Sequence, residues 1–167
     1  MSLIIDGHNV LFAIARHGGR TVSEAIEAAR EELTDQLLRR SRLSREAITV
    51  VYDSRRLTGG AHPDESLPGI RILTSHPPRT ADDDILRLVR ASTAPRTLRV
   101  VTSDRQLGAA CAACGAAVVG AMTFYRELLQ EARSTVKGEA ESRIKTQPPS
   151  DEEVREWLKI FGSGPKE

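Results

Sequence analysis

Hydrophobic positions along the chain fall into short continuous runs that alternate with longer stretches of helical spacing. The short runs predict five strands, over residues 3–5, 48–52, 70–73, 98–101 and 118–119. The longer stretches predict four helices, over residues 22–41, 81–91, 103–114 and 123–133. This alternation is typical of an α/β protein whose helices cover both faces of a parallel sheet.

The signals at the ends of these elements sharpen the prediction. Thr80 is a suitable N-cap for the helix that follows it, and Ser103 could cap the next one. Gly115 suits a left-handed helix terminus. Residues 54–69 contain Gly59-Gly60 and two prolines, so they predict a loop in place of a crossover helix.

The C-terminal part of the chain has a different composition. Residues 134–149 are polar and end in Pro-Pro, which predicts a linker after a domain over residues 1–133. Residues 150–167 begin with a capping box and predict a short amphipathic helix and a tail. That helix could dock onto the domain or bind a partner.

Acidic residues stand where the predicted strands end. Asp6 ends the first strand, Asp104 follows the fourth, and Asp82 and Asp83 open the helix after the third. Acids in the first turn of a helix are stabilised by its dipole, by roughly 0.3–1 kcal/mol each, which could explain each position alone. It does not explain why all of them fall on one sheet edge, where carboxylates repel unless a cation lies between them.

A hard divalent cation, Mg²⁺ or Mn²⁺, is the natural candidate for such an oxygen-rich site. Asn9 could add a neutral amide oxygen to the ligands or donate its N–H to a phosphate. No set of His and Cys has the spacing of a zinc site. Asp53 and Asp84 lie at the same edge, and we interpret them as supporting residues.

Groups suited to phosphate accompany the acids. Thr102 and Ser103 could donate from their hydroxyls and from backbone N–H groups at a helix N-terminus. Arg105 could neutralise a phosphate, and Arg55 with Arg56 could flank a substrate from the loop. The chain has 24 Lys and Arg against 23 Asp and Glu, so net charge is no argument for an anionic partner. With no apolar stretch of about 18 residues and no basic leader, we expect a cytoplasmic protein.

Three motifs carry a family resemblance. Residues 4–10 (IIDGHNV), 80–85 (TADDDI) and 100–105 (VVTSDR) resemble, in order and spacing, the signatures of YacP-like NYN domains in the PIN-like nuclease superfamily. The resemblance covers about residues 1–133. It implies a PIN-like, Rossmann-like three-layer sandwich with a central parallel sheet of about five strands, ordered 3-2-1-4-5.

The resemblance also implies metal-dependent endonuclease activity on RNA, and some bacterial members of this branch act on mRNA in association with ribosomes. His8 replaces the tyrosine that is more common in this branch, which could alter base stacking or phosphate contact. Asp84 stands where the branch often has an aromatic residue. The positions that match the acids and the asparagine of the family are Asp6, Asp82, Asp83, Asp104 and Asn9.

The sequence thus predicts a metal-dependent endoribonuclease that cleaves single-stranded RNA and uses Mg²⁺ or Mn²⁺. A non-catalytic RNA- or ribosome-binding module on the same fold is the alternative. A small-molecule phosphohydrolase is a third hypothesis, although the Asp-x-Asp pair of haloacid dehalogenases, a GxGxxG loop and a P-loop are all missing. The oligomeric state stays open.

Overall fold

The structure is a computed structural model that describes residues 2–19, 22–56 and 63–146, with side chains described only outside 22–25 and 136–146. Six strands form one sheet in the order β3-β4-β2-β1-β5-β6. Neighbouring strands are parallel except β3, which runs antiparallel to β4. The strands are β1 (Ser2–Asp6), β2 (Ala47–Asp53), β3 (Glu65–Leu67), β4 (Ile70–Ser75), β5 (Leu98–Val101) and β6 (Ala117–Val119).

The five predicted strands correspond to β1, β2, β4, β5 and β6, and these five follow the predicted order 3-2-1-4-5, with β3 added beside β4. The predicted loop over residues 54–69 was wrong in part. Its described residues include a 3₁₀ turn, η1 (Ser54–Arg56), and the edge strand β3, which pairs with β4 through a tight turn at Gly69. Gly69 has a φ of 76°, a backbone conformation that glycine adopts without a steric penalty.

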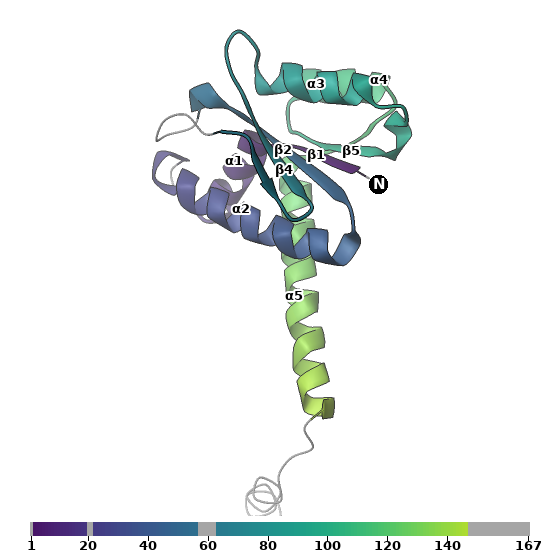
Figure 1. Cartoon of the computed structure of the whole chain (residues 1–167). Coiled ribbons are helices and arrows are strands. Elements are labelled where there is room, and N and C mark those ends of the chain that lie inside the picture. Colours follow the sequence, from purple (N-terminus) through teal and green to yellow (C-terminus); the bar gives the residue numbers. More distant parts are fainter. Residues whose placement is uncertain (1, 20–21, 57–62, 147–167) are drawn as a thin grey trace, which may run out of the picture. The chain divides into compact units, whose positions relative to one another are not determined.

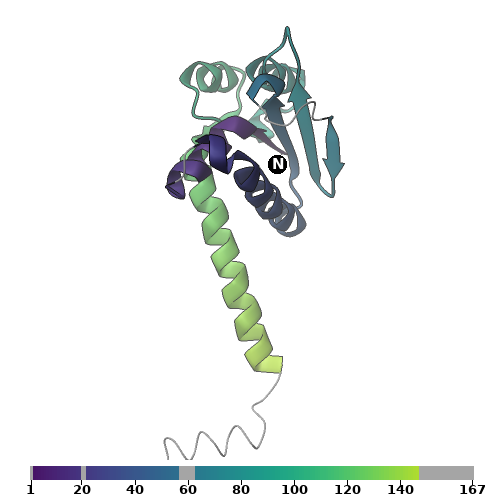
Figure 2. The same cartoon turned by 90° about the vertical axis from the view of Figure 1, so that its left-hand side faces the viewer.

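Helices cover both faces of the sheet: α1 and α2 lie on one side, and α3 and α4 on the other (Figure 1). Figure 2 shows α3 and α4 next to each other at the top of the view. Helix α1 was not predicted; it begins directly after β1, with Asp6 as its N-cap. The helices are α1 (Gly7–His17), α2 (Val22–Ser44), α3 (Ala81–Ala91), α4 (Arg105–Ala113) and α5 (Ala121–Thr146).

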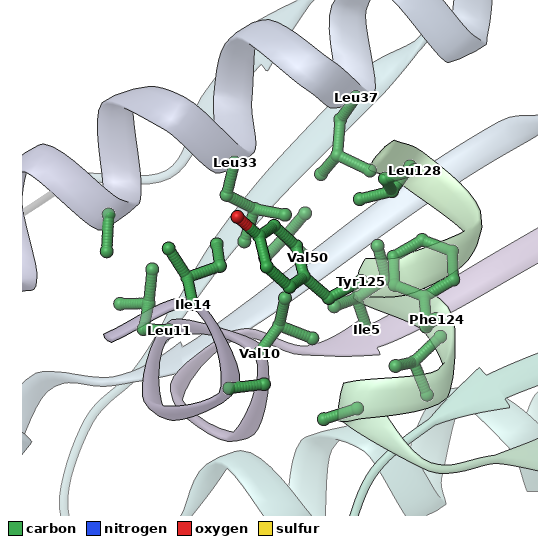
Figure 3. Close-up of a cluster of buried hydrophobic side chains, with 14 of the residues drawn as sticks. Ile5, Val10, Leu11, Ile14, Leu33, Leu37, Val50, Phe124, Tyr125 and Leu128 are labelled. Atoms are coloured by element: carbon green, nitrogen blue, oxygen red, sulfur yellow. The ribbon is translucent and has the colours of Figure 1, made fainter. Parts of the chain in front are cut away.

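Two hydrophobic clusters lie on opposite faces because successive strand residues point to opposite sides. Leu3 and Ile5 of β1 belong to the larger cluster, which packs α1, α2 and the start of α5 against the sheet (Figure 3). Ile4 belongs to the other cluster, under α3 and α4. Burial on both faces holds β1 in the middle of the sheet and fixes the position of the residue at its end.

The helix predicted to end at residue 133 continues to Thr146, so the predicted linker is helical over residues 134–146. Six of these thirteen residues are Lys, Glu, Ala or Arg, which have high helix propensity even without an apolar stripe. The chain divides into two compact units, Met1–Glu131 and Ala132–Glu167. The predicted helix after residue 150 lies outside the described residues, and the predicted domain boundaries stay a prediction.

None of the helices in the described part of the chain is long and apolar enough to cross a membrane.

Candidate functional site

The site lies at the end of β1, where the strand order reverses. The strands that follow β1 in sequence are first placed on its β2 side, and β5 and β6 are then placed on its other side. Asp6 ends β1 and is only 4% exposed. Its carboxylate accepts hydrogen bonds from the backbone N–H of Asn9 at 3.3 Å and from the Asn9 side-chain amide. The Thr102 hydroxyl donates to Asp6 Oδ2 at 3.2 Å. A carboxylate has about four lone-pair directions, so Asp6 keeps room for one further ligand.

Thr102 ties this carboxylate to the next segment of the site. Its hydroxyl oxygen accepts the backbone N–H of Asp104 at 3.1 Å while the hydroxyl donates to Asp6. Thr102 is buried directly beyond the end of β5. The Thr102 proton is thus directed at Asp6 in this arrangement, and its donation to a substrate phosphate stays a prediction.

Asp104 is the N-cap of α4, and the predicted cap, Ser103, is not. Asp104 Oδ1 accepts the backbone N–H groups of Gln106 at 2.7 Å and Leu107 at 2.9 Å. Its Oδ2 makes no hydrogen bond within the residues that the structure describes. The Ser103 hydroxyl oxygen instead accepts the backbone N–H of Ala121 at 3.1 Å, at the start of α5.

Asp82 completes the acidic group from the first turn of α3. Partial burial raises the pKa of Asp82, and the negative charges of Asp6 and Asp104 raise this pKa further. The positive charge of Arg56 opposes them. Asp82 is therefore close enough to Asp6 and to Asp104 to be repelled by both carboxylates, and the role of the three as metal ligands stays a prediction.

Asp83 is engaged elsewhere. It forms a capping box with Thr80, whose backbone N–H and hydroxyl donate to Asp83 Oδ2 at 2.9 and 2.8 Å. These hydrogen bonds hold the pKa of Asp83 below its usual value, and the charges of Arg55 and Arg79 lower it further. The Asp83 carboxylate is thus engaged with Thr80 in this structure. Its role as a metal ligand stays a prediction.

Asp84 is buried, and its hydrogen bonds are with residues outside the acidic group. The Ser75 hydroxyl at the end of β4 donates to Asp84 Oδ2 at 2.6 Å. Arg87 donates from Nε and Nη2 to Oδ1 at 3.2 and 3.1 Å. Asp84 thus joins α3 to β4, which is a structural task beside the site.

The arginines of η1 are exposed beside the acidic group. Asp53 Oδ1 accepts the backbone N–H of Arg55 at 2.9 Å, which closes the turn after β2. Arg56 lies close enough to Asp82 to lower its pKa. Arg105, in the first turn of α4, is also exposed. The three arginines predicted to bind phosphate therefore face solvent at this edge of the sheet, whereas Asp53 has a structural role.

His8 is a buried residue rather than a base-stacking one. It is 1% exposed and meets the Tyr52 ring edge to face, with centroids 5.5 Å apart. Its Nδ1 accepts the backbone N–H of Asp53 at 3.4 Å, and its buried Nε2 has no well-formed hydrogen bond to any residue that the structure describes. Burial lowers the pKa of His8, which keeps the imidazole neutral. The sequence position suggested a substrate contact, but the side chain packs inward.

Gly7 is also required by packing. A Cβ at this position would lie 2.3 Å from Tyr52 Cε1, closer than real Cβ atoms approach a ring carbon. The Asp-Gly motif thus lets the first turn of α1 pass over Tyr52, which is why the chain can turn sharply after Asp6.

The donor set suits a hard divalent cation that retains water ligands. Asp6, Asp82 and Asp104 provide carboxylates, and a cation would relieve the repulsion of Asp82 by the other two. Within the described ranges, no group of three or more His, Cys, Asp or Glu residues is arranged to enclose a metal directly. Mg²⁺ usually takes only one or two carboxylates and keeps several waters, so this looser arrangement fits it.

A mostly parallel sheet of this order, with carboxylates at its point of strand reversal, defines an α/β protein of the PIN-like nuclease class. The profile of the YacP-like NYN domain matches residues 3–160, so the chain belongs to the YacP-like NYN domain family.

Two solved structures share the fold of this chain. The crystal structure of Rae1 (YacP) from Bacillus subtilis is 21% identical, with a TM-score of 0.70, over 97% of this chain and 92% of that one. A tryptophan-to-leucine mutant of the same Bacillus subtilis protein is 23% identical, with a TM-score of 0.61, over 96% of this chain and 92% of that one. At these identities the likeness supports the fold. A comparison with curated proteins gave no match.

Proposed function

We propose that the protein is a metal-dependent endoribonuclease that cleaves single-stranded RNA. The observation that carries the proposal is the link from Asp6 through the Thr102 hydroxyl to Asp104 at the point of strand reversal. Asp82 lies close enough for the charges of both carboxylates to raise its pKa. Membership of a PIN-like nuclease family supports the same reaction class. Clustered carboxylates serve phosphodiester hydrolysis when they hold a divalent ion.

Asp6, Asp82 and Asp104 would hold Mg²⁺ or Mn²⁺, with the amide oxygen of Asn9 beside them. When bound, such an ion activates water and neutralises charge on the phosphate. The chain's own residues prepare the site: Thr102 fixes the Asp6 carboxylate relative to α4 through two hydrogen bonds.

The exposed arginines at this edge, Arg55, Arg56 and Arg105, would contact the RNA backbone. Exposed backbone phosphates suit guanidinium groups, which bind them with paired N–H donors. The family resemblance makes cytoplasmic mRNA, alone and on ribosomes, the substrate to test first.

The test is a cleavage assay on a labelled single-stranded RNA, titrated with Mg²⁺ and with Mn²⁺. Wild type should produce internal cuts, and Asp6→Asn and Asp104→Asn should each lose cleavage while keeping the folded circular dichroism spectrum. Asp35→Asn, on the exposed surface of α2, is the matched control for removing one carboxylate and should cut normally.

Undiminished cutting by Asp6→Asn, or by wild type in EDTA, would contradict the proposal. RNA binding with no cleavage under either metal would favour the non-catalytic binding module instead.

A further inference from the structure

Two arginines outside the site described above, Arg79 and Arg87, form ion pairs with the buried carboxylate of Asp84. Arg87 donates to Asp84 Oδ1 from Nε at 3.2 Å and from Nη2 at 3.1 Å. Arg79 Nε lies 3.7 Å from the same oxygen. The Asp84 side chain is 7% exposed, whereas those of Arg79 and Arg87 are 60% and 59% exposed.

Both guanidinium groups contact the same oxygen of Asp84, Oδ1. Asp84 is itself fixed, because its second oxygen accepts the Ser75 hydroxyl at 2.6 Å. A guanidinium group has five N–H donors. Arg87 uses two of them on Asp84, whereas Arg79 forms an ion pair with the same oxygen at 3.7 Å without a hydrogen bond. The remaining donors of two positioned, exposed guanidiniums are available to an anion from solvent.

The pair lies next to the proposed active site. Arg79 stands just before α3, and its charge acts together with that of Arg55 on Asp83, the neighbour of Asp82. Arg87 lies on α3, one turn after Asp84. Exposed arginines therefore stand at η1, just before α3 and within that helix, on either side of the three aspartates of its first turn.

We propose that Arg79 and Arg87 bind backbone phosphates of single-stranded RNA outside the scissile phosphodiester, with Asp84 as the residue that positions them. The proposal rests on the proposed function for the identity of the substrate. Guanidinium groups bind phosphates with paired N–H donors whatever the base, so this contact adds affinity and orientation without reading sequence. It also gives the three consecutive aspartates three different tasks: Asp82 belongs to the acidic group, Asp83 caps α3, and Asp84 positions the arginines.

The test measures binding of the full chain to a single-stranded oligouridylate of about twelve nucleotides, in EDTA so that cleavage does not interfere. The Kd is followed between about 50 and 200 mM salt for wild type, Arg79→Ala and Arg87→Ala. Each substitution should weaken binding about three- to fivefold and reduce the slope of log K against log salt by about 0.7. Arg96→Ala is the matched control, because Arg96 is an exposed arginine just before β5, at the opposite edge of the sheet.

Asp84→Asn separates positioning from charge. Removing a negative charge alone would tighten RNA binding, whereas releasing two positioned arginines should weaken it. A thermal melt verifies that this variant folds, and the two arginine variants keep the proposal testable if it does not. Tighter binding by folded Asp84→Asn would overturn the positioning role.

Equal affinities and salt slopes for Arg79→Ala, Arg87→Ala and Arg96→Ala would overturn the binding site, as would a wild-type chain that does not bind the oligonucleotide. These outcomes are distinct from failure of the proposed function. RNA binding that depends on the two arginines, without cleavage under any metal, would contradict the proposed nuclease activity and support the binding site. RNA cleavage with binding that does not depend on the two arginines would support the nuclease activity and contradict the binding site.

Discussion

Helices α1 and α4 begin differently from α3, although all three begin at the same edge of the sheet. In α1 and α4 the N-cap is an aspartate at the site, Asp6 or Asp104, whose carboxylate accepts backbone N–H groups of its own helix. In α3 the capping is done by Thr80 and Asp83. Asp82 is thereby released from capping and can act on other charges.

The difference shows how a helix start can serve structure and chemistry together. A capping carboxylate is held in place by its helix, so Asp6 and Asp104 form the rigid part of the acidic group. Asp82 makes no hydrogen bond to another residue in the described part of the chain, and its raised pKa reflects partial burial and then repulsion from the two capping carboxylates. A site with two fixed carboxylates and one free one can adjust to a ligand without unwinding a helix.

The different roles of Asp82 and Asp83 are tested most directly by neutralising each of these adjacent carboxylates in turn. Asp82→Asn should reduce RNA cleavage on the order of 100-fold, because it removes charge that would hold the metal. Asp83→Asn should keep most of the activity, since its carboxylate serves the capping box. Initial rates at saturating Mn²⁺ measure both. Equal losses in the two variants would support the predicted ligand role of Asp83.

The start of α1 can be tested through its packing against Tyr52. Gly7→Ala should lower the free energy of unfolding by about 2–3 kcal/mol, because the added methyl overlaps a buried ring. Gly108→Ala is the matched control inside α4, where a Cβ would meet Val118 Cγ1 at an ordinary 3.4 Å. That variant should gain about 0.5 kcal/mol from helix propensity. Urea denaturation gives both values, and equal signs would contradict the packing argument.

The cap of α3 should contribute stability without contributing to the reaction. Thr80→Ala should lower the free energy of unfolding by about 1 kcal/mol, since it exposes the N–H of Asp83 that the hydroxyl now satisfies. Thr80→Ser keeps the hydroxyl and should lose much less. Parallel thermal melts and cleavage assays would measure this, and a large loss of cleavage by folded Thr80→Ala would show that the cap also shapes the site.

The smallest expected effect is the pH dependence of Asp82. Its folded-state pKa is raised, so the folded chain holds that proton more tightly than the unfolded chain and ionised Asp82 opposes folding. In EDTA, Asp82→Asn should therefore melt slightly higher than wild type at neutral pH. The difference should disappear as the pH falls through the raised pKa. Mg²⁺ should stabilise wild type more than the variant, and the absence of any such difference would argue against the repulsion.

Much of the fold was predictable because its signals are local. Buried strands such as β5 (Leu98–Val101) read as continuous apolar runs, and the strand ends placed Asp6 and Asp104 at one edge. Helix α1 was missed although Val10, Leu11 and Ile14 recur at helical spacing, because the Asp-Gly pair before them also suits a turn. Strand β3 has no apolar pattern, since its three residues stand at an edge with no fully buried side chain.

The separation of the three aspartates could not be predicted from their sequence alone. Consecutive helical residues point about 100° apart, so only one of Asp82, Asp83 and Asp84 can face any given neighbour. The Thr80-x-x-Asp83 spacing does suggest a capping box, which was a signal available for Asp83. The role of Asp84 depends on its hydrogen bond with Ser75 of β4. Such a contact between two segments can be recognised only in the folded structure.

The Thr102 hydroxyl has a consequence for motion and for sequence tolerance. Thr102 Oγ1 donates to the Asp6 carboxylate at the end of β1 and accepts the backbone N–H of Asp104, the N-cap of α4. A displacement of α4 by an incoming strand of nucleic acid would therefore be transmitted to Asp6, and the two carboxylates would move as a unit. Serine could replace threonine here and keep this mechanical link, whereas valine, with almost the same shape, would separate the two halves of the site.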